Sequence, residues 1–257
     1  MPTITVDHAS KYYYNRTQRR WLLRRRAQRE IGVEDVSLTI EQGEFVFIIG
    51  SSGAGKSTLL NLLAGRMQPD HGSVSINGKK LYGLKRWRET RLPLLIGYVS
   101  QQHTLQRSVT IAENLRQAAR LGERKFDDKN DFDERIRKVL GLTGLAGMER
   151  RYPGELTTGE QRRAELARAL INSPPILVLD EVIANQSADS AWDLFLLLTE
   201  INRMGTTIIM ATHNSEYVNM MRRRVIMLVH GRVYSDENKG RYGEIKQKKT
   251  LDDPLLL

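Results

Sequence analysis

The sequence predicts an α/β fold in which helices cover a mostly parallel β-sheet. Three observations predict it. Short apolar runs typical of buried strands alternate with helical segments along most of the 257 residues. A glycine-rich loop at residues 50–57 joins one such strand to a helix, and a later apolar strand ends in the acidic pair Asp180-Glu181. Because parallel strands present their carboxyl ends at one edge of a sheet, we expect the loop and the acids to meet there.

Each strand is expected from its apolar pattern and from the residues that end it. Residues 3–6 alternate in polarity, Phe45–Ile49 is apolar throughout, and residues 71–78 end in an Asn-Gly turn. Ile176–Leu179 is again fully apolar, which is typical of a strand buried on both faces. In chain order, the expected strands are residues 3–6, 31–40, 45–49, 71–78, 96–99, 176–179, 207–211 and 225–229.

The helices are expected between these strands. Residues 108–150 are rich in charge and mainly helical in pattern. The tail from Gly240 is polar and lysine-rich, and we expect it to be frayed. The expected helices are residues 57–64, 110–121, 133–141, 157–170 and 188–203.

Composition restricts the class of protein. The length suits one α/β domain with a smaller lobe. The chain has no cysteine, which excludes a disulfide framework and fits a reducing compartment. No apolar run approaches the roughly 20 residues that span a bilayer, and the N-terminus lacks the pattern of a secretory signal. We therefore expect a soluble, cytoplasmic protein.

The glycine-rich loop carries the clearest chemistry. It fits the pattern G-x-x-x-x-G-K-[ST], in which glycines let backbone N–H groups point at phosphate oxygens. Lys56 is expected to reach the β- and γ-phosphates, and the Ser57 hydroxyl to bind Mg²⁺. The pattern thus predicts that the chain binds ATP with Mg²⁺. The predicted nucleotide-binding residues of this segment are Gly50, Ser51, Ser52, Gly53, Ala54, Gly55, Lys56, Ser57 and Thr58.

The acidic pair after residues 176–179 predicts the rest of the reaction centre. The buried strand carries Asp180 to the sheet edge beside the loop, where its carboxylate would hold Mg²⁺ directly or through water. Glu181 is placed to orient or deprotonate the attacking water.

The order of further motifs resembles the ATP-binding cassette (ABC) ATPases over nearly the whole chain. After the phosphate-binding loop come Gln101, the segment Leu156–Gln161, the acidic pair and His213. Segments such as Ala164–Pro175 and Met210–Asn214 resemble most closely the branch of this family that acts in bacterial cell division. The ATPases of lipoprotein release and macrolide export resemble these segments less well.

The resemblance implies one P-loop NTPase domain of ABC type. Its mostly parallel core and small antiparallel β lobe would comprise residues 1–100 and 156–239, with a helical subdomain at 101–155. A basic insertion would occupy residues 15–29, and a polar tail residues 240–257.

The resemblance also implies roles for single residues. Tyr13 would stack on adenine, with Tyr12 and Tyr14 as close alternatives. Gln101 would complete the metal shell of Ser57 and Asp180. His213 would contact the γ-phosphate and act with Glu181 in catalysis. His103 has no such support and is expected to lie on the loop surface.

Two departures from the family pattern lie in segments that would face a second subunit. The family signature Leu-Ser-Gly-Gly-Gln or Leu-Ser-Gly-Gly-Glu is replaced by a segment in which a threonine stands for one glycine. The carboxylate that would communicate between the two sites is replaced by Ser187. We therefore expect slowed closure on ATP and slowed hydrolysis. The signature residues that would act on the nucleotide of the other subunit are Thr157, Thr158, Gly159 and Glu160.

The basic insertion is a third departure. Seven arginines and no acid lie between Arg16 and Arg29, with Trp21, Leu22 and Leu23 among them. Such a segment suits an anionic membrane surface or a membrane partner. A solvated basic loop fits it equally well, and nucleic acid is the least favoured partner.

Three functions follow from these observations. The resemblance to the cell-division branch implies a head-to-tail homodimer that hydrolyses ATP and drives a separate integral membrane protein with four transmembrane helices, to control cell-wall hydrolysis. It would lie at the inner face of the plasma membrane. A nucleotide-gated scaffold with weak or no hydrolysis is the alternative that the altered signature favours, and the ATPase subunit of a transporter is another. Action on ribosomes or DNA is disfavoured, because such proteins usually carry two cassettes or a long coiled coil.

Overall fold

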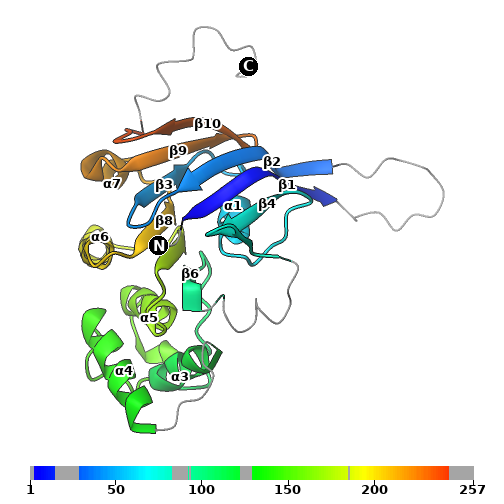
Figure 1. Cartoon of the computed structure of the whole chain (residues 1–257). Coiled ribbons are helices and arrows are strands. Elements are labelled where there is room, and N and C mark those ends of the chain that lie inside the picture. Colours follow the sequence, from blue (N-terminus) through cyan, green and yellow to red (C-terminus); the bar gives the residue numbers. More distant parts are fainter. Residues whose placement is uncertain are drawn as a thin grey trace, which may run out of the picture.

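A computed structural model of the chain describes residues 3–14, 29–82, 92, 94–121, 129–184 and 186–242, with side chains 129–131 left out. Two β-sheets lie at one end of the molecule, and the helices α3, α4 and α5 form the other (Figure 1). The predicted insertion falls almost wholly outside the described residues, as does most of the tail. The proposed division into a core and a helical subdomain stays a prediction.

The larger sheet has a parallel core, as the sequence predicts. Strands β9, β3, β8, β7 and β6 pair in parallel, and β10 adds to the edge in the antiparallel direction. Every residue of β3, β7 and β8 is buried, which is why these strands are apolar except for Asp180 at the end of β7 and Thr207 at the start of β8. In spatial order the strands are β10 (Arg232–Glu237), β9 (Arg224–Val229), β3 (Phe45–Ile49), β8 (Thr207–Ala211), β7 (Ile176–Asp180) and β6 (Ile96–Val99).

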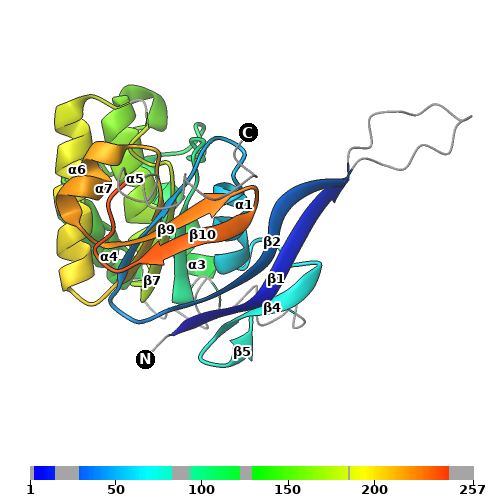
Figure 2. The ribbon, with the colours of Figure 1, turned by 90° about the horizontal axis from the view of Figure 1, so that it is seen from above.

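The smaller sheet is antiparallel and forms the predicted β lobe. Its order is β2 (Arg29–Ile40), β1 (Ile4–Tyr14), β4 (His71–Ile76) and β5 (Lys79–Lys80). Strand β1 continues far beyond the expected residues 3–6, because its second half pairs with β2 through register shifts as far as Tyr14 and Arg29. Seen from above, β1 and β2 project together from the body (Figure 2). The position of the insertion is therefore the end of a projecting two-stranded ribbon.

Helix α1 (Lys56–Leu63) packs between the two sheets. Its leucines are fully buried in a cluster with Val33 and Val36 of β2 and with Val46 and Ile48 of β3. The phosphate-binding loop that precedes α1 is thus fixed on both sides by apolar packing, which holds its backbone in place before any ligand arrives.

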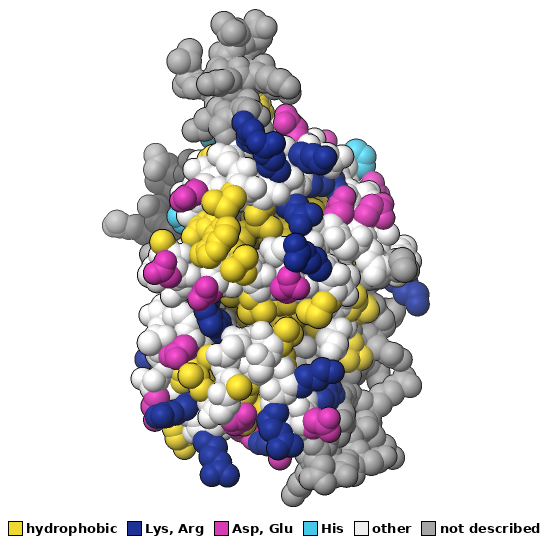
Figure 3. Space-filling view, turned by 90° about the vertical axis from the view of Figure 1, so that its left-hand side faces the viewer, with side chains coloured by type: hydrophobic (Ala, Val, Ile, Leu, Met, Phe, Trp, Pro, Cys, Tyr) yellow, Lys and Arg dark blue, Asp and Glu magenta, His cyan; other side chains and the backbone are white. Residues whose placement is uncertain are grey.

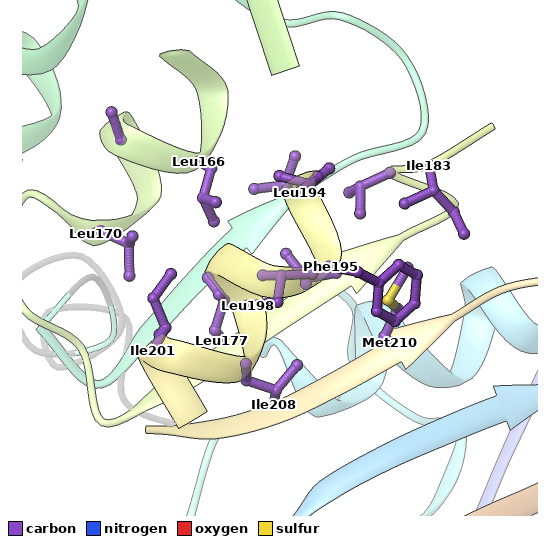
Figure 4. Packing of buried hydrophobic residues seen from close by; sticks show 14 of the residues in the cluster. Leu166, Leu170, Leu177, Ile183, Leu194, Phe195, Leu198, Ile201, Ile208 and Met210 are labelled. Carbon is purple, nitrogen blue, oxygen red and sulfur yellow. The ribbon is translucent and has the colours of Figure 1, made fainter. Parts of the chain in front are cut away.

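The other face of the larger sheet is covered by helices. Leucine and isoleucine side chains of α5 and α6 meet β7 and β8 in one cluster (Figure 4). Burying such side chains contributes about 1.5–3 kcal/mol each. The helices, with one 3₁₀ turn, are α3 (Ile111–Leu121), α4 (Lys129–Leu142), η1 (Pro153–Glu155), α5 (Thr158–Leu170), α6 (Ala188–Arg203) and α7 (Ser215–Met221).

Besides the turn η1, three elements were not expected from the sequence. Helix α7 has seven residues and is capped by Asn214, whose side chain accepts from the backbone N–H of Glu216 and Tyr217. Strand β10 is largely polar, and its Asp236 accepts two bonds from the Arg224 guanidinium, at 2.8 and 2.7 Å. The third is the two-residue strand β5.

The surface over α6 and α7 carries exposed apolar side chains (Figure 3). They include Trp192 and Leu196 of α6 and Met220 of α7. Within the described part of the chain, no helix is long and apolar enough to cross a membrane.

Candidate active site

A cavity of about 600 Å³ opens at the carboxyl ends of the central strands. The phosphate-binding loop after β3, Glu181 after β7 and His213 after β8 all border it. Two predicted residues, Ala54 and Asp180, are buried and do not line it, although Asp180 is hydrogen-bonded to the lining residue Ser57. The predicted residues that line the cavity are Tyr13, Gly50, Ser51, Ser52, Gly53, Gly55, Lys56, Ser57, Thr58, Gln101, Glu181 and His213.

The backbone of the loop and Lys56 suit an anionic ligand. Gly55 has a φ of 100°, and a Cβ there would lie 2.2 Å from the carbonyl oxygen of Gly32, so no other residue fits without movement. The Lys56 ammonium donates to the carbonyl oxygens of Gly50 and Ser51, both at 3.0 Å. These bonds fold the lysine back over the loop, where its charge and the start of α1 act together.

Asp180 is a buried carboxylate with an unused oxygen. Its Oδ1 has no hydrogen-bond partner among the described residues. Burial raises the pKa of the Asp180 carboxyl, and the charge of Glu181 adds to the rise, whereas the Ser57 hydroxyl and Lys56 lower it. A buried acceptor that lies beside a serine hydroxyl and lacks a partner suits Mg²⁺, which is often held by one or two carboxylates together with substrate phosphates.

Glu181 and His213 form a pair at the edge of the cavity. The His213 Nδ1 lies 2.9 Å from Glu181 Oε2, and Lys56 Nζ lies 4.0 Å from the other carboxylate oxygen. The glutamate side chain is 9% exposed and the histidine 67%. Glu181 has a φ of 50°, and its N–H donates to the Ala211 carbonyl, so the strained turn after β7 aims the carboxylate into the cavity.

The structure separates the three candidate tyrosines. Tyr13 lines the cavity, and its hydroxyl lies 3.2 Å from the Thr58 hydroxyl. The Tyr12 ring instead contacts Arg29, whose guanidinium carbon lies 3.3 Å from the centre of the ring. Tyr14 is 61% exposed and does not line the cavity. Of the three, Tyr13 is therefore placed to stack on a base.

Gln101 is held in place by helix α5. Its carbonyl oxygen accepts a bond from Arg162, which also donates to the Ser100 carbonyl at 2.8 Å. Arg162 pairs at 2.7 Å with Glu165, and both side chains are buried. Glu165 also accepts the Thr104 N–H at 2.6 Å.

His103 lies on an exposed loop, as the sequence predicts. Its ring Nδ1 also lies 3.3 Å from the buried Glu165 carboxylate, so the loop of residues 101–104 contacts α5 through Glu165.

The signature residues begin helix α5 and lie apart from the cavity of their own chain. Thr157 is the N-cap, and its hydroxyl and N–H both donate to the Glu160 carboxylate at 2.8 Å. Ser187 is the N-cap of α6, and its hydroxyl accepts the backbone N–H of Ser190 at 3.3 Å and donates to the Ser190 hydroxyl at 3.0 Å. A Cβ on Gly159 would lie 3.4 Å from the Ser190 hydroxyl, so the two departures from the family pattern belong to neighbouring helix starts.

Four lining residues were not predicted: Glu30, Ile31, Gly32 and Tyr242. Tyr242 belongs to the tail that was expected to fray. Its N–H donates to Asn219 of α7 at 2.6 Å, and its ring packs against the helix-side core cluster. Burial raises the pKa of the Tyr242 phenol, and the charge of Glu181 raises it further. The local sequence gives no signal for this position, because the contacts come from a distant helix.

The fold and this cavity define an ATP-binding cassette, and comparison with known proteins agrees. Residues 33–184 match the family described as ABC transporter, so the chain belongs to the ABC transporter family of ATPases. It is 42% identical over 209 residues to the cell division ATP-binding protein FtsE of Streptococcus pneumoniae, which covers 81% of this chain and 89% of that protein.

Two further comparisons extend over more of the chain. The FtsE protein of Mycobacterium tuberculosis is 36% identical over 240 residues, or 93% of this chain and 98% of that one. A solved dimeric ATP-binding cassette in a post-hydrolysis state, bound to ADP and Pi, matches with a TM-score of 0.78 and 28% identity, over 93% of this chain and 100% of that chain.

Proposed function

We propose that this chain binds ATP with Mg²⁺ and hydrolyses it as the motor subunit of a membrane complex. The observation that carries the proposal is the shared cavity of the phosphate-binding loop, Glu181 and His213, with the buried Asp180 hydrogen-bonded to Ser57 of that loop. The phosphates would lie on the loop amides and Lys56, and the base on Tyr13. Ser57, Asp180 and Gln101 would hold Mg²⁺, which would offset negative charge on the phosphates.

Glu181 is proposed as the general base. Its carboxylate borders the cavity, and His213 orients it through the 2.9 Å contact. Glu181 would take a proton from the water that attacks the γ-phosphate, while Lys56 stabilises the negative charge on the phosphate oxygens. The position of His213 at the same edge would also let it contact the γ-phosphate.

A homodimer is proposed because the signature lies apart from its own cavity. In a head-to-tail pair, residues 157–160 of one copy would reach the nucleotide of the other. The related solved cassette with ADP and Pi is dimeric.

The proposed partner is an integral membrane protein like FtsX, and the proposed role is control of cell-wall hydrolysis in division. The similarity to FtsE proteins over more than four-fifths of the chain supports it. The chain would then be peripheral at the inner face of the plasma membrane. The arginines of residues 16–29, most of them outside the described part of the chain, would add attraction to anionic lipid.

A nucleotide-gated scaffold is the second candidate. Thr158 and Ser187 favour it, because they alter the two helix starts that would close on ATP. A transporter subunit of the lipoprotein-release or macrolide-export type is a third.

The partner is tested by purification from solubilised membranes in mild detergent. Co-elution of a protein with four transmembrane helices, identified by mass spectrometry, is the expected result. Co-elution of a transporter permease instead would indicate transport, and the absence of any membrane protein would contradict the proposed complex.

A further inference from the structure

The chain returns to the nucleotide cavity at Tyr242, the last residue that the structure describes. Tyr242 lines the cavity together with Glu181 and His213, although it lies far from both in the sequence. The proposed reaction gives this side chain no role. A phenol at a reaction centre can both donate and accept hydrogen bonds, and it can therefore orient a water molecule.

Three contacts fix the position of Tyr242. Its backbone N–H donates to the side chain of Asn219 on α7 at 2.6 Å, and its ring packs against the helix-side core cluster. Two residues earlier, the Gly240 N–H donates to the Arg223 carbonyl oxygen at 3.1 Å. A Cβ on Gly240 would lie 2.9 Å from the Cβ of Val225, so the backbone lies directly against β9. The ring is thus held beside the cavity by the fold.

Helix α7 connects Tyr242 to the segment that carries His213. Asn214, which directly follows His213, caps the start of α7, and Asn219 holds Tyr242 near the end of the same helix. Tyr217 between them is buried, and its ring stacks on a phenylalanine of α6 with 4.5 Å between the ring centres. The two cavity side chains are therefore fixed through one short, packed helix.

The hydroxyl of Tyr242 is available beside Glu181. It forms no hydrogen bond with any residue that the structure describes. Burial raises the pKa of the phenol, and the negative charge of Glu181 raises it further, so the phenol keeps its proton at neutral pH. A protonated phenol offers one donor and two acceptor lone pairs, whereas a carboxylate offers acceptors alone.

We propose that Tyr242 is a further residue of the hydrolysis reaction and holds the attacking water together with Glu181. The inference rests on the proposed function and deepens it. A water between a carboxylate and a phenol oxygen gives one O–H to each, which leaves a lone pair of the water directed away from both. That lone pair would face the γ-phosphate held by the loop and Lys56, as an oriented nucleophile requires.

The reaction step balances without any transfer to the tyrosine. The water oxygen forms a bond to the γ-phosphorus while the bond from that phosphorus to the bridging oxygen of ADP breaks. One water proton passes to Glu181, and the other O–H stays hydrogen-bonded to the Tyr242 oxygen. The phenol keeps its own proton. Tyr242 is thus neither the base nor a nucleophile, and its hydroxyl orients the water.

Steady-state hydrolysis by Tyr242→Phe tests the hydroxyl, because this variant keeps the ring and its packing. It should lower kcat about three- to tenfold, which corresponds to one lost hydrogen bond between uncharged groups. The KM, and the ATP affinity measured by calorimetry, should stay unchanged. Tyr234→Phe is the matched control, since Tyr234 packs against the same core cluster and does not line the cavity. Thermal unfolding checks that each variant folds.

A double-mutant cycle with Glu181 separates orientation of the water from a purely structural role. In Glu181→Gln the base is lost, so removing the Tyr242 hydroxyl should slow single-turnover phosphate release by less than about twofold further. A structural effect of the hydroxyl would instead slow both backgrounds by the same factor.

Three results would overturn the inference and leave the proposed function intact. They are an unchanged kcat for Tyr242→Phe, a raised KM with unchanged kcat, and an equal loss of rate in both backgrounds of the cycle. If the parent itself releases no phosphate from bound ATP, the proposed hydrolysis fails, and the inference fails with it.

Discussion

At the scale of single residues, the proposed reaction centre combines Lys56 with the buried carboxylate of Asp180, one oxygen of which lacks a hydrogen-bond partner among the described residues. Lys56 is already turned toward the loop by two bonds to backbone carbonyls. Asp180 is buried with one oxygen unused among the described atoms. A buried unpaired oxygen costs stability, and together with the lysine it suits a ligand that carries phosphates and a metal ion.

The lysine is tested by Lys56→Ala. A charge-assisted contact contributes about 1.5–3 kcal/mol, so ATP affinity should fall at least tenfold. Calorimetry measures it, with Lys79→Ala on the exposed strand β5 as the control. If Lys56→Ala binds ATP as tightly as the parent, residues 50–57 are not the phosphate-binding loop.

The buried acid is tested by Asp180→Asn. Burial raises the folded-state pKa of this carboxyl above its pKa in the unfolded chain. The parent therefore loses stability as the pH rises from the unfolded-state pKa through the folded-state pKa. At neutral pH the variant should be more stable by about 1 kcal/mol, or roughly 2–4 °C in Tm. The gain should vanish at acidic pH, where the parent carboxyl is protonated.

The same variant should bind ATP less tightly, and only when Mg²⁺ is present. Thermal melts at several pH values and calorimetry with and without Mg²⁺ provide the measurements. A variant that is less stable at neutral pH, or whose ATP affinity is unchanged with Mg²⁺, would contradict the role of Asp180.

At the scale of elements, the apolar core strands could be predicted from the sequence, whereas the polar strands and helices at the edges of the fold could not. Phe45–Ile49 and Thr207–Ala211 have the predicted bounds because each is buried along its whole length. Strand β1 was predicted too short, since residues 10–14 are polar or aromatic and owe their extension to distant pairing with β2. Helix α7 and strand β10 depend likewise on a cap and on a cross-strand ion pair.

The candidate site, like the fold, is only partly predictable from the sequence. The loop residues, Asp180 and Glu181 were predicted from local motifs, and His213 from the family resemblance. Tyr242 and the Arg162–Glu165 pair were not, because their positions result from contacts with residues far away in the sequence.

The neighbouring starts of α5 and α6 give a prediction for the altered signature. Thr158→Gly removes a β-branched side chain, and Ser187→Asp restores a carboxylate while keeping an N-cap residue on α6. If these departures slow closure, the double variant should dimerise more readily with ATP and hydrolyse it several-fold faster. The glycine should cost about 0.5–1 kcal/mol of stability.

Each single variant serves as the control, because adjacent sites are expected to couple. ATPase activity and the dimer fraction are measured on the same samples. If neither quantity rises, Thr158 and Ser187 do not slow closure or hydrolysis.

At the scale of the whole molecule, Tyr14 and Arg29, between which most of the basic insertion falls in the sequence, form the last pair of the projecting β1–β2 ribbon (Figure 2). We predict a role in membrane recruitment. Replacing Arg19, Arg20, Arg24, Arg25 and Arg26 with Ser should weaken binding to anionic liposomes, and the parent's binding should fall with added salt. Liposome co-sedimentation measures both. Equal binding of parent and variant would leave the segment as a solvated loop.

Hydrolysis by Glu181 is the central claim, and phosphate release measures it most directly. With ATP bound to the same extent, the parent should release phosphate about 10²–10⁴ times faster than Glu181→Gln, which keeps the shape of the side chain and loses the base. The variant should also accumulate an ATP-bound dimer. Equal release by both proteins would contradict the role of Glu181, and no release by the ATP-bound parent would support the scaffold instead.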